Sequence, residues 1–210
     1  MSVSPAEDRI LTGPNVLTIS RLFWAAALFA CIATERWALG LLMFAIAAFS
    51  DWFDGVWARW THQTSAFGRV MDPLIDKVMI CGAFIYLLPL PESGLLPWMV
   101  TVVLAREFLI TGIRGYLEQQ GRKFGADQWG KWKMGTQCAY LLAVLLVQSL
   151  RDAPITASVW PALQVVQVVL LWAMLALTIY SGVQYLWKAF RSPSTPPPDG
   201  ATNQPPIDNP

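Results

Sequence analysis

Residues 37–59 read WALGLLMFAIAAFSDWFDGVWAR, an apolar run of helical length that ends in acidic residues. Roughly 20 apolar residues are enough to cross a lipid bilayer as a helix. Asp51 and Asp54 lie near the end of this run, where a carboxylate is costly unless it is hydrated, paired or bound to a metal. The stretch therefore predicts a membrane helix that carries a functional site.

The whole chain shares this apolar character. Hydrophobic residues make up 55% of its 210 residues and charged residues only 14%. Such a composition favours a membrane protein over a soluble domain. The sequence predicts an all-α integral membrane protein with six transmembrane helices, near residues 16–33, 37–57, 74–90, 95–117, 134–150 and 159–190.

Basic residues are unevenly placed between these spans. Of the fifteen Lys and Arg residues, Arg36 and Arg151 are the ones in the first, third and fifth breaks. Apart from Arg106 within the fourth span, the others lie near the termini, in the second and fourth breaks, or at span ends that face them. Because basic residues gather on the cytoplasmic side, we predict a multi-pass inner-membrane protein with both termini in the cytoplasm. The expected partners include membrane lipids and no nucleic acid.

The two ends of the chain differ from its middle. Residues 192–210 contain seven prolines and almost no large apolar side chain, which predicts a disordered tail. Residues 1–191 are predicted to form one membrane domain. Residues 1–10 lack the basic head, apolar run and cleavage site of a signal peptide.

The first acidic pair shares one helix face with small residues. Counted from Trp37 at about 1.5 Å per residue, Asp51 lies roughly 20 Å along its helix, in the cytoplasmic half of the membrane. At about 100° per residue, Asp51, Asp54, Gly55 and Ala58 fall within roughly a 100° arc. We therefore predict an active site that opens to the cytoplasm.

The next span carries a second acidic pair. Asp72 and Asp76 are four residues apart, so they point the same way, and Pro73 between them suits a first helical turn. Four facing carboxylates repel one another unless they share protons or bind cations. Hard cations such as Mg²⁺ or Mn²⁺ suit them, and small residues including Gly68 leave room for a bulky ligand such as a diphosphate.

Acids at these positions are also compatible with two different roles. They could form interfacial salt bridges with Arg59, Arg69 and Lys77 around a helix crossing. They could instead line a cation or proton pathway in a transporter, although clustering at one membrane edge fits that role less well.

The spacing of the acids resembles the signature of the CDP-alcohol phosphotransferase family. The pattern is Asp-x-x-Asp-Gly-x-x-Ala-Arg, eight residues, then Gly-x-x-x-Asp-x-x-x-Asp. All of its specified positions are filled, by Asp51, Asp54, Gly55, Ala58, Arg59, Gly68, Asp72 and Asp76. Eight specified residues in 26 positions make a chance match improbable.

Further segments resemble one branch of that family, the phosphatidylglycerophosphate synthases. These segments are residues 13–21 (GPNVLTISR), Arg106-Glu107 with Arg114, and residues 130–133 (GKWK) followed by Gln137. Met134-Gly135 departs from the Thr pair expected there, which bears on the branch and not on the chemistry.

The resemblance implies a metal-dependent phosphatidyltransferase that acts on CDP-diacylglycerol. Two divalent cations, Mg²⁺ or Mn²⁺, would be held by Asp51, Asp54, Asp72 and Asp76. Asp76 would also be the general base. The nucleotide and diphosphate pocket would be formed by Gly55, Ala58, Arg59 and Gly68, closed by Asn15 and Thr18. The resemblance also implies that the protein forms a homodimer.

The second substrate is predicted from basic residues. Arg106 lies well inside the fourth span, where its charge requires an anion; Glu107 alone could supply it. Arg114, Lys131 and Lys133 add positive charge at the cytoplasmic edge, and the two lysines also suit membrane anchoring. The excess favours a phosphate-bearing acceptor such as sn-glycerol 3-phosphate, which would give phosphatidylglycerol phosphate and CMP.

Enzymes of the same fold could use another acceptor. Phosphatidylglycerol would give cardiolipin, and serine or an inositol phosphate would give other lipids. A cation transporter is the alternative from a different class of protein.

Overall fold

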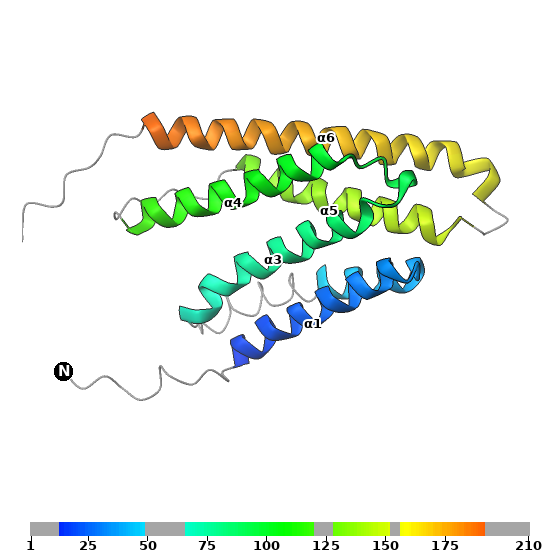
Figure 1. The fold of residues 1–210 in the computed structure, drawn as a ribbon, viewed down its shortest axis with the longest axis horizontal. Coiled ribbons are helices and arrows are strands. Elements are labelled where there is room, and N and C mark those ends of the chain that lie inside the picture. The colour runs from blue at the N-terminus through cyan, green and yellow to red at the C-terminus, as the bar shows by residue number, and fades with distance from the viewer. Residues whose placement is uncertain (1–12, 49–65, 120–127, 152–155, 192–210) are drawn as a thin grey trace, which may run out of the picture.

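The computed structural model describes residues 13–48, 66–119, 128–151 and 156–191, and these residues are helical apart from short turns (Figure 1). The all-α class predicted from the sequence is therefore confirmed for this part of the chain. The helices are α1 (Gly13–Ala33), a helix at Trp37–Ala48, α3 (Ala66–Leu87), α4 (Pro97–Gln119), α5 (Gln128–Ser149) and α6 (Thr156–Arg191), with a 3₁₀ turn, η1 (Pro91–Ser93), before α4.

Two helices begin more than one helical turn earlier than the apolar runs suggest. α3 begins at Ala66 rather than Leu74, and α5 begins at Gln128 rather than Met134. A hydropathy count marks where apolar residues start, whereas a helix continues through polar residues as long as its backbone hydrogen bonds form. The expectation that Pro73 lies in a first helical turn is wrong, because nearly two turns of α3 precede it.

The helix α3 lies at the centre of the bundle. It contacts α1 on one side and α4 and α5 on the other, while α6 packs against α5 and α4. In Figure 1, α6 runs along one edge of the bundle and α1 lies toward the opposite edge. Side chains on α3 are therefore placed to face residues from both halves of the chain.

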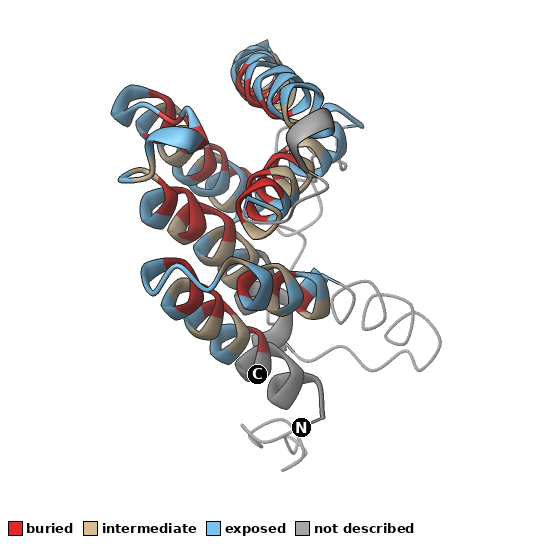
Figure 2. Cartoon of the chain, turned by 90° about the vertical axis from the view of Figure 1, so that its right-hand side faces the viewer, coloured by how far each residue is buried: buried red, intermediate tan, exposed pale blue. Residues whose placement is uncertain are grey.

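The apolar core occupies one end of this bundle. It is formed by the C-terminal halves of α1, α3 and α5, the start of α4 and the middle of α6. Its fully buried side chains include Leu28, Phe84, Val103, Tyr140 and Met174. In Figure 2 the buried positions face neighbouring helices and the exposed positions face outward. The polar side chains described below lie beyond this core along the helices.

A polar cap closes the core at the η1 turn. The hydroxyl of Tyr140 donates to the carbonyl of Ser93 over 2.7 Å, and the Gln167 amide donates to the carbonyl of Glu92 over 2.6 Å. Gly94 follows with φ of 70°, a left-handed conformation that suits glycine. These contacts tie α5 and α6 to the turn before α4 and so fix the end of the bundle remote from the candidate site.

The outward faces are apolar as well. Phe23, Phe108, Trp172 and Phe190 are each more than half exposed. A soluble helix bundle instead places charged and polar residues on its outer faces. Such large exposed apolar side chains are typical of helices that face lipid.

Among the described helices, one stretch, Val159–Arg191 of α6, is long and apolar enough to cross a membrane. The helices α3, α4 and α5 carry charged residues in their interiors, which lowers their mean hydropathy. The predicted count of six spans and the side on which the termini lie therefore stay predictions.

Close packing of α1 against α3 depends on Gly82. A Cβ at this position would lie 2.8 and 2.9 Å from Cε1 and Cε2 of Phe29, whose ring stacks on Tyr86 with centroids 5.1 Å apart. Gly82→Ala is expected to destabilise the protein by about 1–3 kcal/mol, because overpacking forces a ring out of place. The measurement is the thermal unfolding midpoint in detergent.

The control is Gly112→Ala, because a Cβ there meets nothing within 4 Å among the described residues. It should leave the midpoint unchanged or raise it slightly through higher helix propensity. Equal midpoints for the two variants would contradict the packing described here.

Candidate active site

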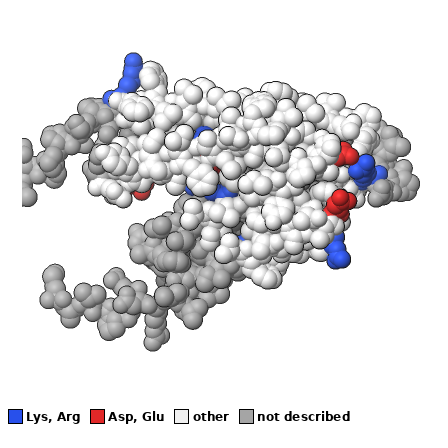
Figure 3. Space-filling model, viewed as in Figure 1, with Lys and Arg blue, Asp and Glu red and all other residues white. Residues whose placement is uncertain are grey.

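A layer of polar and charged side chains lies next to the apolar core. All five labelled α-helices contribute to it, and its members are buried or half-buried: Arg21, Asp76, Lys77, Arg106, Glu107, Lys133, Gln137 and Ser181. Figure 3 shows basic atoms recessed near the middle of one face, beside uncharged surface. Buried charges are costly unless they are paired or bind a ligand, so this layer is the candidate site.

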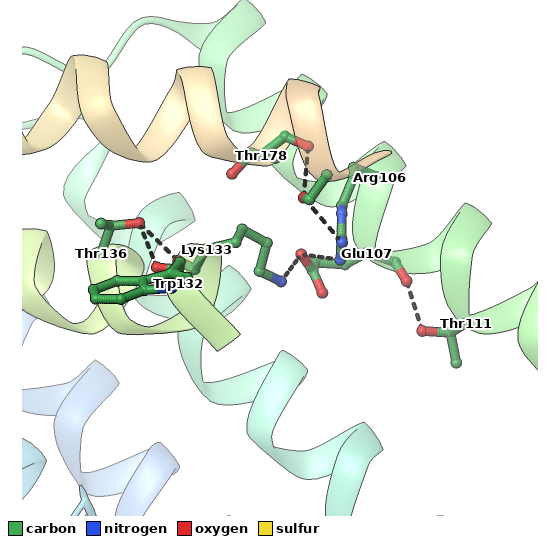
Figure 4. A network of polar contacts seen from close by, with 8 residues as sticks. Arg106, Glu107, Thr111, Trp132, Lys133, Thr136 and Thr178 are labelled. Atoms are coloured by element: carbon green, nitrogen blue, oxygen red, sulfur yellow. Dashed lines mark hydrogen bonds and ion pairs between the residues drawn. The ribbon is translucent and has the colours of Figure 1, made fainter. Parts of the chain in front are cut away.

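Glu107 joins two cations in this layer (Figure 4). Its Oε1 accepts from Nζ of Lys133 on α5 and lies 3.3 Å from Nη1 of Arg106. Glu107 and Lys133 are only 4% and 5% exposed. Two positive charges therefore share one carboxylate, and the cluster keeps an excess of positive charge that suits an anionic ligand.

Arg106 has a further contact with α6. Its Nη2 donates to Oγ of Ser181 over 3.1 Å. Its Nε is buried and makes no hydrogen bond within the described residues. The guanidinium has five N–H donors, so donors remain for an anion beyond the contacts with Glu107 and Ser181.

The predicted acceptor residues are not all brought together. Arg106 and Lys133 meet through Glu107, whereas Arg114 lies over the ring of Tyr185, 5.7 Å from its centroid. Lys131 is exposed. Residues two positions apart point to roughly opposite sides of a helix. The spacing of Lys131 and Lys133 alone could therefore have predicted that only one of them faces the site.

Asp76 is the member of the predicted acidic cluster whose side chain is described. Its Oδ1 lies 3.7 Å from Nη1 of Arg21 on α1, and the carboxyl is 21% exposed. Asp72 lies four residues earlier on the same helix, so its backbone is one turn away. The pair therefore occupies one face of α3, as the spacing predicts.

The remaining predicted site residues fall where less is described. Five of them lie outside the described residues: Asp51, Asp54, Gly55, Ala58 and Arg59. For four others the structure describes only the backbone, within α1 or α3: Asn15, Thr18, Gly68 and Asp72. Within the described residues, no group of three His, Cys, Asp or Glu residues could hold a metal ion. The predicted metal ligands stay a prediction.

Three site residues were not assigned by sequence reasoning. Arg21 lies in the quoted segment 13–21, yet its contact with Asp76 was not anticipated. Ser181 and Gly182 lie in an apolar stretch of α6 that carries no motif. Their contacts with Arg106 join residues about 75 positions apart, which spacing along one helix does not reveal.

A helical bundle that is apolar outside and charged inside has the architecture of a membrane protein with a polar site between its helices. The chain belongs to the CDP-alcohol phosphatidyltransferase family, whose pattern matches residues 11–180. This family is the one expected from the motif between Asp51 and Asp76, and that expectation is confirmed.

Several relatives carry names that specify their reaction. The chain is 33% identical, over 73% of its length and 76% of the relative's, to the CDP-diacylglycerol--glycerol-3-phosphate 3-phosphatidyltransferase of Bacillus subtilis. It is 29% identical to the protein of the same name from Haemophilus influenzae, over 82% of this chain and 90% of the relative. It is also 32% identical to a cardiolipin synthase (CMP-forming) of Oryza sativa, over 89% of this chain and 60% of the relative.

Proposed function

We propose that this protein transfers the phosphatidyl group of CDP-diacylglycerol to sn-glycerol 3-phosphate, giving phosphatidylglycerol phosphate and CMP. The observation that carries the proposal is the pair of cations, half-buried Arg106 and buried Lys133, on the single carboxylate of Glu107. An acceptor with a phosphate monoester would satisfy this excess charge. The names of the Bacillus and Haemophilus relatives support the same reaction.

Asp76 is proposed as the general base. It would take the proton of the acceptor hydroxyl, whose oxygen then attacks the phosphorus that carries the diacylglycerol group. The bond from that phosphorus to the CMP oxygen breaks, CMP leaves, and the proton remains on Asp76 until it passes to water. Arg21, 3.7 Å away on α1, would hold the carboxylate in place.

Metal binding is proposed for the acidic residues Asp51, Asp54, Asp72 and Asp76. Carboxylate oxygens are the donors that Mg²⁺ and Mn²⁺ prefer, and the placement of Asp72 and Asp76 one turn apart on α3 fits this use. Two divalent cations bound there would neutralise the diphosphate and stabilise the charge on departing CMP. The diphosphate and nucleotide pocket is assigned to Gly55, Ala58, Arg59, Gly68, Asn15 and Thr18.

The acceptor phosphate is assigned to Arg106, Arg114, Lys131 and Lys133. Among these, the half-buried Arg106 and the buried Lys133 would make the direct contacts. The exposed Lys131 and the more peripheral Arg114 would attract the anion toward the site.

We also propose that the protein crosses the inner membrane six times with both termini and the site on the cytoplasmic side. The ion pair between Glu92 and Arg151, 3.1 Å apart, fits the even spacing of spans in this topology, because it joins the third and fifth breaks at one end of the bundle. Residues 1–191 would form the membrane domain and residues 192–210 a disordered tail. A homodimer surrounded by membrane lipids is the proposed assembly.

Lys133→Gln is expected to raise the KM for glycerol 3-phosphate by about 10- to 100-fold, the effect of losing one charge-assisted hydrogen bond. The KM for CDP-diacylglycerol should stay within about twofold, because the lipid nucleotide is assigned to other residues. The measurement is the rate of CMP release by purified protein as each substrate is varied.

The matched control is Lys188→Gln, which removes an exposed lysine at the end of α6 that has no assigned role. It should behave as the wild type. An unchanged KM for glycerol 3-phosphate in Lys133→Gln would contradict the assignment of the acceptor phosphate.

The similarity to the rice cardiolipin synthase favours a second candidate acceptor, phosphatidylglycerol. That acceptor has no phosphate monoester, so a site for it would not need both Arg106 and Lys133 as cations. Full activity of Lys133→Gln with phosphatidylglycerol as acceptor would favour cardiolipin synthesis over the proposed reaction.

A further inference from the structure

The side chain of Arg106 is held from two sides. Nη1 faces Glu107 on its own helix, and Nη2 donates to the Ser181 hydroxyl on α6. The Ser181 hydroxyl lies 3.2 Å from the carbonyl oxygen of Thr178 and donates its proton there. Its lone pairs are then left to accept from Arg106, which gives the contact a fixed direction.

The neighbouring residue provides the space for this arrangement. A Cβ at Gly182 would lie 3.1 Å from Cγ of Arg106, closer than an ordinary van der Waals contact. Because Gly182 has no side chain, the aliphatic stem of Arg106 rests directly against α6. A methyl group there would push the stem, and with it the guanidinium, away from Ser181.

The position of this guanidinium matters more than that of a flexible surface arginine. Arginine binds phosphate through a planar fork of N–H donors, so small rotations change which donors can be used. The Arg106 side chain is only 14% exposed. Its surroundings on α4 and α6 therefore determine where its remaining donors point.

We infer that Ser181 and Gly182 are positioning residues for acceptor recognition, which seat Arg106 so that its free donors meet the phosphate of the acceptor. The inference rests on the proposed function, because it assumes that Arg106 contacts that phosphate. Both residues lie just past the segment matched by the family pattern, which ends at residue 180. The C-terminal half of α6 would thus set the position of a charged side chain in a site whose charged residues lie on α4 and α5.

The test compares Ser181→Ala and Gly182→Ala with the control Gly112→Ala in purified, detergent-solubilised protein. Each of the first two variants is expected to raise the KM for glycerol 3-phosphate by about tenfold. The KM for CDP-diacylglycerol should match that of the control, which separates a change in acceptor recognition from a general loss of folded protein. Ser181→Ala adds no bulk, so it keeps the test decisive if Gly182→Ala does not fold.

A double-mutant cycle separates positioning from general structural damage. If Ser181 acts through Arg106, Ser181→Ala should have no further effect on the KM for the acceptor once Arg106 is replaced by Ala. Additive effects in Ser181→Ala/Arg106→Ala would overturn the inference. A wild-type KM in both single variants of α6 would overturn it too, while leaving the proposed function intact.

Failure of the proposed function gives a different result. If the wild-type protein releases CMP with phosphatidylglycerol, whose phosphate is a diester, and not with glycerol 3-phosphate, the proposed reaction is wrong. The same cycle is then measured with the acceptor that is used. Coupling between Ser181 and Arg106 with that acceptor would support the positioning role, and its absence would overturn the inference as well.

Discussion

Asp76→Asn is expected to lower kcat for CMP release by about a thousandfold or more. Asparagine has nearly the same size and shape as aspartate, but it cannot take the proton from the acceptor hydroxyl, and general base catalysis contributes about 10²- to 10⁴-fold. Loss of a negatively charged metal ligand should add to the effect. The measurement is CMP release at saturating concentrations of both substrates.

Glu118→Gln is the matched control, because it neutralises an exposed acid near the end of α4 that has no assigned role. Both variants should elute and unfold in detergent as the wild type does. If Asp76→Asn kept kcat within about threefold of wild type, Asp76 would be neither the base nor an essential ligand.

Removal of divalent cations should abolish the reaction to background. Without cations, four ionised carboxylates would repel both one another and the diphosphate of CDP-diacylglycerol. Incubation with EDTA followed by assay is the measurement, and EDTA presaturated with Mg²⁺ is the control. Addition of Mg²⁺ or Mn²⁺ should restore activity, whereas a rate insensitive to EDTA would rule out the proposed metal chemistry.

The helical class and the approximate place of each described helix followed from the apolar runs. A run long enough to cross a bilayer is a local property, so the sequence carries it directly. Helix starts did not follow in the same way. At Ala66 and Gln128 the helices begin ahead of the long apolar runs, where hydropathy gives no signal.

The candidate site was predictable where one helix sets the geometry. The four-residue spacing of Asp72 and Asp76 places both on one face of α3, whatever the rest of the chain does. Arg106 within an apolar span indicated that an anion must lie nearby, and Glu107 accepts from its guanidinium. That Glu107 also binds Lys133 depends on how α4 and α5 are rotated against each other, which no local pattern specifies.

The contacts that α6 makes with Arg106 were the part of the candidate site least predictable from the sequence. Ser181 and Gly182 are common residues in an apolar helix, and nothing in their immediate sequence separates them from packing residues. Their relation to Arg106 arises because α6 packs against α4. Such a relation becomes visible only when both helices are placed in three dimensions.

The central claim is the transfer of a phosphatidyl group to glycerol 3-phosphate, and one assay tests it most directly. Purified protein in detergent is given CDP-diacylglycerol and Mg²⁺, and CMP release is compared for glycerol 3-phosphate, glycerol, serine, an inositol phosphate and phosphatidylglycerol. Release driven by glycerol 3-phosphate, with phosphatidylglycerol phosphate as the lipid product, is the predicted result. Release driven by another acceptor and not by glycerol 3-phosphate would contradict the claim.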